Sequence, residues 1–107
     1  MSLKNAVKQY AYDLGADLVG VGNVERCEHA PLMMSPQGLL PSARSVVVMA
    51  LRHPDGCIET GGETHPQAIG PYRVQYLMNS RLDEMSYRMG TFLERHGAQA
   101  VPIVSSN

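Results

Sequence analysis

The sequence has few cysteines, no long apolar run and no basic cluster. Two cysteines, Cys27 and Cys57, are too few for a secreted disulfide scaffold or for the four thiolates of an iron–sulfur cluster. No apolar stretch reaches the ~20 residues of a membrane span, and the N-terminal segment lacks the apolar core of a signal peptide. We therefore expect a cytoplasmic protein without a membrane partner.

The charge balance is close to neutral. Nine Lys and Arg residues against ten Asp and Glu residues give a net charge of −1, and no basic run occurs. Sequence-independent binding to nucleic acid requires a positive surface, so we expect no nucleic-acid partner. The length of 107 residues, with 44% hydrophobic and 18% charged residues, is typical of one globular domain.

Two segments have the periodicity of amphipathic helices. Residues 2–14 place their apolar side chains on one face, with Ser2 as the N-cap and Gly15 as the stop. A longer helix is expected over residues 71–96, ended by Gly97. Its core-facing residues are Val74, Met78, Leu82, Met85, Met89, Phe92 and Leu93.

Three segments favour strands, at residues 17–22, 45–51 and 98–104. The run 45–51 is apolar without alternation, which is typical of a strand buried on both faces, with Val47 at its centre. Because a long helix joins the second strand to the third, we expect these two to be parallel with a right-handed crossover. The prolines of residues 23–44 leave room for one helical turn. The expected fold is α/β, of order α-β-β-α-β, with a mostly parallel three-stranded sheet and helices packed on it.

Gly20, Gly22 and Glu25 stand where a dinucleotide-binding loop would have G-x-G-x-x-G. The third glycine is absent, and Pro31 prevents a helix from beginning at Asn23. Phosphate binding of that kind requires a helix N-terminus directly after the loop. We interpret the glycines instead as making room for a helix or ligand to approach the strand.

Cys27, His29, His53 and Cys57 follow the first two predicted strands. If those strands are parallel neighbours, the four side chains emerge at one edge and can hold zinc tetrahedrally. Their spacing matches no common zinc motif, so we favour surface histidines and unreactive thiols.

Tyrosines flank the core-facing side of the long helix, at Tyr72, Tyr76 and Tyr87. Ordinary packing at the rim of the core is the simpler interpretation. The alternative is a planar ligand that packs on the rings, helped by Arg73 and the helix N-terminus. In that case Tyr72, Arg73 and Tyr76 form the cofactor-binding site.

Three stretches resemble the epoxyqueuosine reductase and reductive dehalogenase-like proteins. They are AVKQYAYDLGADLVGVG, LPSARSVVVMAL and FLERHGAQAVPI, which follow the order of that family's first helix and strand, second strand, and next helix and strand. The resemblance extends over nearly the whole chain. The matching positions are Gly15, Asp17, Val19, Gly20, Val21, Pro41, Arg44, Ser45, Gly97 and Pro102.

The resemblance implies the N-terminal part of a cobalamin-dependent reductase with a nitroreductase-like α/β domain. In that family, 4Fe-4S clusters bound by C-x-x-C-x-x-C-x-x-x-C-P runs pass electrons to the corrinoid. No such run occurs here, and no catalytic residue of the family maps onto this chain. We expect a fragment that cradles the cofactor, has no cluster or reductase activity alone, and has the remainder of the parent polypeptide as partner. The alternative is a small binding or assembly module that homo-oligomerises through an open sheet edge near Val101–Val104.

Overall fold

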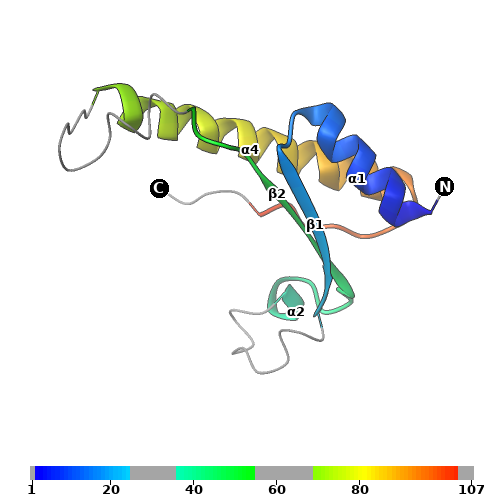
Figure 1. Ribbon diagram of the computed structural model, residues 1–107. Coiled ribbons are helices and arrows are strands. Elements are labelled where there is room, and N and C mark those ends of the chain that lie inside the picture. Colours follow the sequence, from blue (N-terminus) through cyan, green and yellow to red (C-terminus); the bar gives the residue numbers. More distant parts are fainter. Residues whose placement is uncertain (1, 25–35, 55–68, 104–107) are drawn as a thin grey trace.

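The computed structural model describes residues 2–24, 36–54 and 69–103 (Figure 1). In this part of the chain, three helices and two strands follow one another as helix, strand, helix, strand and helix. The fold is therefore α/β. The helices are α1 (Leu3–Leu14), α2 (Pro36–Leu39) and α4 (Ile69–Arg95), and the strands are β1 (Leu18–Asn23) and β2 (Ser45–Ala50).

Helix α1 has both of the caps that the sequence predicts. The backbone N–H of Asn5 donates a hydrogen bond to Ser2 Oγ at 3.2 Å, which satisfies one of the free donors of the first turn. Gly15 ends the helix with φ of 111° in the left-handed region, where a side chain would be strained. The inward face buries Val7 and Ala11.

Helix α4 buries the methionines expected from its periodicity. Met78, Met85 and Met89 are all buried, and Met85 and Met89 join the residues of α1 in one core cluster. The ring of Phe92 stacks on Tyr10 of α1, with centroids 4.3 Å apart. The helix begins two residues before the predicted position, and Gly97 follows its end with φ of 87°.

The sheet is antiparallel and two-stranded within the described residues, so the prediction of a parallel three-stranded sheet is wrong. β1 pairs with β2 from Leu18↔Ala50 to Asn23↔Ser45. Residues 98–103 form no strand. Pro102 has no N–H to donate to a ladder, and its ring packs instead on Gly90 of α4. The proposed third strand is thus held against the helix.

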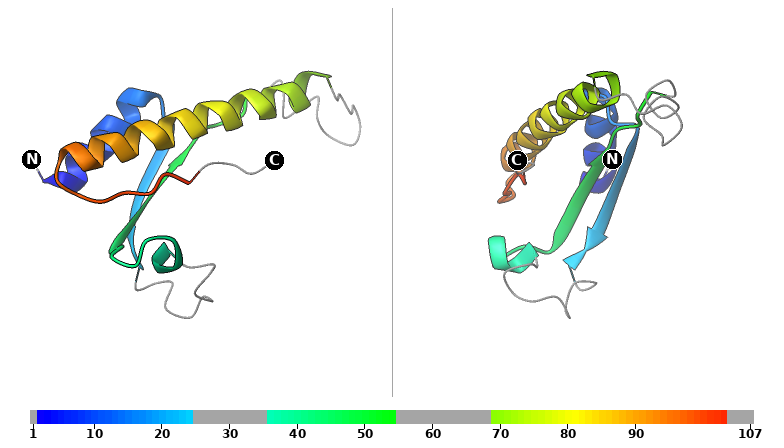
Figure 2. Two further views of the ribbon diagram at one scale, coloured as in Figure 1. Left: turned by 180° about the vertical axis from the view of Figure 1, so that it is seen from behind. Right: turned by 90° about the vertical axis from the view of Figure 1, so that its left-hand side faces the viewer.

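Both long helices cover the same face of the sheet, called here the inner face (Figure 2). Val19 and Val21 of β1, with Val47 and Met49 of β2, pack against the buried core from this face. On the outer face, by contrast, Val48 is 58% exposed. The expectation that residues 45–51 are buried on both faces is therefore wrong for the described structure, because α1 and α4 pack on one side only.

The fold is elongated rather than spherical. The radius of gyration is 16.1 Å, compared with about 13 Å for a compact domain of this length. Among the described helices, none is long and apolar enough to cross a bilayer.

Candidate functional site: an open apolar cavity

An open cavity of about 980 Å³ lies beside the inner face of β2. Its roof is the C-terminal half of α4, and its floor is α2 with the turn that follows. Residues 97–103 form the remaining wall, because they pass beneath α4 on the helix side of the sheet (Figure 2). The main apolar contributors are Val47, Met49, Met89, Leu93, Val101 and Ile103.

The cavity exists because the chain reverses direction after α4. The backbone N–H groups of His96 and Ala98 both donate to the carbonyl of Leu93, at 3.0 and 3.1 Å, and Gly97 between them takes a positive φ. The reversed segment then lies against the helix at Gly90. A Cβ atom built on Gly90 would lie 2.8 Å from Pro102 Cγ, so the absence of a side chain permits this contact.

Few polar groups line the cavity. Ser42 Oγ donates a hydrogen bond to Gln99 Oε1 at 3.0 Å, which links the floor to the wall formed by residues 97–103. Arg44 is the one charged side chain among the described residues of the lining. The lining residues that the structure describes include no carboxylate and no imidazole, and together they offer a mostly apolar surface for binding.

The predicted tyrosine site lies away from this cavity, on another part of α4. Tyr76 is 50% exposed, and 200° of helical rotation separates it from buried Met78. The cavity-lining part of α4 begins at Ser86, about 15 Å further along the helix. Tyr72 and Arg73 belong to α4, but their side chains lie outside the described residues.

The alternative of a zinc site formed by cysteines and histidines, which required parallel strands, loses its geometric premise. Because β1 and β2 are antiparallel, the segments that follow them leave from opposite ends of the sheet. His53 follows β2, and its Nε2 lies 2.9 Å from Gln75 Oε1 of α4. Cys27, His29 and Cys57 lie outside the described residues. No group of three or more metal-ligating side chains occurs among the residues that are described.

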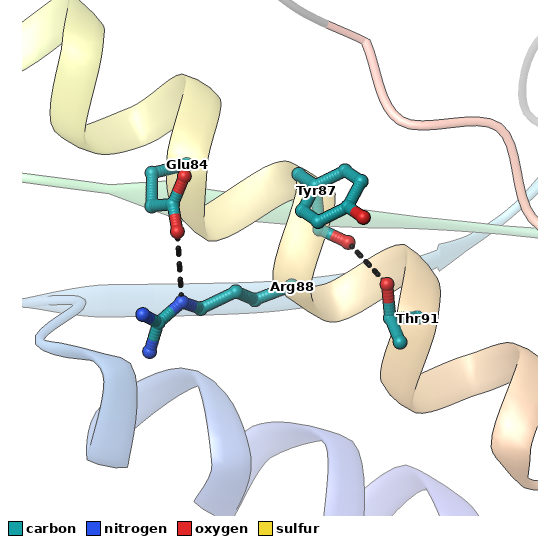
Figure 3. Close-up of polar contacts among 4 residues, drawn as sticks. All are labelled: Glu84, Tyr87, Arg88 and Thr91. Carbon is teal, nitrogen blue, oxygen red and sulfur yellow. Dashed lines mark hydrogen bonds and ion pairs between the residues drawn. The ribbon is translucent and has the colours of Figure 1, made fainter.

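The exposed side of α4 carries polar contacts within the helix itself (Figure 3). Arg88 Nε donates to Glu84 Oε1 at 3.0 Å, and both side chains are more than half exposed. Thr91 Oγ1 donates to the carbonyl of Tyr87 at 3.2 Å. An exposed pair four residues apart contributes about 0.3–0.5 kcal/mol, so this contact gives the helix modest support.

The substitution Gly90→Ala tests whether the contact between Pro102 and Gly90 holds residues 97–103 against α4. Alanine favours a helix interior by about 0.5–1 kcal/mol, but here its methyl group meets the Pro102 ring. We expect the thermal midpoint to fall, with a net cost of about 1 kcal/mol, and amide exchange of Ala98, whose N–H donates to the carbonyl of Leu93 in the chain reversal, to become faster.

The control for this prediction is the double variant Gly90→Ala with Pro102→Ala. It removes the Cγ and Cδ atoms that the new methyl would meet, and we expect it to restore slow exchange. A Gly90→Ala protein with a raised midpoint and unchanged exchange would contradict the contact.

Sequence reasoning did not find the cavity, because its walls come from segments far apart in the chain. Two signals were available: Gly90 within an otherwise well-formed helix, where a glycine can mark close packing, and Pro102 in an apolar run, where a proline interrupts a strand. Comparisons of the chain with protein-family models, curated proteins and solved structures found no match.

Proposed function

We propose that this chain is a cofactor-cradling α/β module of an oxidoreductase similar to the epoxyqueuosine reductase and reductive dehalogenase-like proteins. The observation that carries the proposal is the open apolar cavity of about 980 Å³ on the inner face of β2. Sites for organic ligands are typically concave and mostly apolar, with a few polar groups that orient the ligand. The cofactor class, a corrinoid, comes from the sequence resemblance.

Several residues of the described lining support a corrinoid as the ligand. The corrin ring needs a broad apolar surface, and Val47 and Met49 of β2 supply part of one. The amide groups at the ring's border match hydrogen-bonding side chains such as Ser42 and Gln99, and Arg44 suits the phosphate of the nucleotide arm. When bound, the corrinoid supplies the reducing centre. The residues of this chain bind it, orient it and exclude water from the covered face.

A 4Fe-4S cluster does not fit this chain. Such a cluster needs four thiolates, and the sequence contains two cysteines. The proposal therefore assigns cluster binding to further polypeptide and gives this module no electron-transfer step.

Corrinoid content tests the proposal in the polypeptide that the cell makes from this sequence. Ile103→Asp places a charge on the cavity wall at a side chain that is 64% exposed, so we expect lost corrinoid and an unchanged thermal midpoint. Leu18→Asp is the matched control on the outer face of the sheet, where we expect full corrinoid content.

The tyrosine site is tested in the same assay. If Tyr76→Ala and Arg73→Ala lower corrinoid content while Ile103→Asp does not, the cofactor lies on the tyrosine face of α4 and the cavity assignment is wrong. Full content in all these variants, measured from absorbance of the extracted corrinoid, would contradict both sites.

A further inference from the structure

Strand β2 has an unpaired edge in the part of the chain that the structure describes. Its hydrogen bonds to β1 occupy one edge, and every second residue of such a strand directs its N–H and C=O groups the other way. Within the described residues, no backbone hydrogen bond is formed at the edge of β2 that faces away from β1. The edge of β2 carries three consecutive valines, whereas β1 contains Gly20 and Gly22, which weaken a strand.

We propose that β2 pairs with β2 of a second copy of this chain. The two strands run antiparallel about a twofold axis, which extends the sheet to the order β1–β2–β2–β1. The edge supports this partner because Ser45–Ala50 contains no charge and no proline, so its residues can face their own copies without repulsion. A net charge of −1 likewise leaves little repulsion between whole chains.

The edge pairing occupies backbone groups of β2 and leaves the cavity to its ligand, so the dimer and the corrinoid are tested separately.

Charge selects the register of the two β2 strands. With Val47 on the twofold axis, Arg44 faces Ala50 of the other copy. A shift to Val48 on the axis instead places Arg44 opposite Arg52 at both ends, and like charges directly opposite are destabilising. The first register is therefore the expected one, and it places Val46 beside Val48 of the other copy on the outer face.

Disulfide trapping tests the register in a Cys27→Ser, Cys57→Ser background. Chains carrying Val46→Cys are mixed with chains carrying Val48→Cys. Residues directly opposite have Cα atoms about 4.5–5.5 Å apart, within the range that a disulfide spans. We expect cross-linked dimer from the mixture and little from either chain alone. Efficient cross-linking of Val48→Cys with itself would overturn the Val47-centred pairing.

Sedimentation with a matched pair of variants tests the dimer itself. Val48→Lys adds a charge beside the edge of β2, and we expect the dimer dissociation constant to rise about tenfold. Leu18→Lys adds the same charge on the outer face of β1, away from the β2 edge. This variant should leave the dimer dissociation constant unchanged. Both side chains are largely exposed, so both variants should fold. A wild-type protein that sediments as a monomer at high micromolar concentration would overturn the proposal.

Discussion

Val47→Asp is expected to abolish soluble folded protein, whereas Val48→Asp is expected to preserve the fold. Val47 packs against the core from the inner face, and an unpaired carboxylate there costs several kcal/mol. A small domain is stable by only about 5–15 kcal/mol in total. The adjacent side chain of Val48 is 58% exposed on the outer face, where a carboxylate stays hydrated.

Soluble yield and the thermal midpoint by circular dichroism distinguish the two variants. Because the substitutions are identical and adjacent, they differ only in the face of the sheet that receives the charge. A soluble Val47→Asp protein with the wild-type midpoint would show that the inner face has been assigned incorrectly.

Met85→Ala is expected to have the second-largest effect. Met85 is buried between α4 and α1 in the core cluster, and removal of such a side chain costs about 2–5 kcal/mol. For a domain of this size, each kcal/mol lowers the thermal midpoint by about 4–8 °C, so a fall of about 10–30 °C is expected. The described core contains few large buried side chains to compensate for the loss.

Leu77→Ala on the same helix is the control for this loss. Its side chain is 54% exposed, so its removal should change stability by about 0.5 kcal/mol or less. Equal midpoints for the two variants would contradict the assignment of Met85 to the core.

The helices were predictable because their signals are local. The apolar period identifies both long helices, and Ser2, Gly15 and Gly97 mark ends that the structure confirms. The pairing of the strands was not predictable in the same way, because its direction depends on the path of the chain between β1 and β2. Pro102 lies within the predicted third strand, and its contact with Gly90 of α4 depends on tertiary packing that no local pattern reports.

The candidate site was harder to predict than the fold. Helical periodicity correctly separates Tyr76 from the core-facing methionines, but that separation also places it away from a cavity next to the core. The cavity instead combines Val47, Gly90 and Ile103, which no sequence period relates. The outer face of the sheet was also predicted incorrectly. The unbroken apolar run of β2 predicts a strand covered on both faces, but in the described chain helices cover only the inner face.

Corrinoid content of the wild-type protein tests the central claim most directly. The polypeptide that the cell makes from this sequence would be purified without oxygen, and its corrinoid would be extracted and quantified against protein concentration. If the chain is a cofactor-cradling module, the wild-type protein contains one corrinoid per chain. The Ile103→Asp variant is folded and contains none. Folded wild-type protein that contains no corrinoid, and that acquires none from added hydroxocobalamin, would contradict the account.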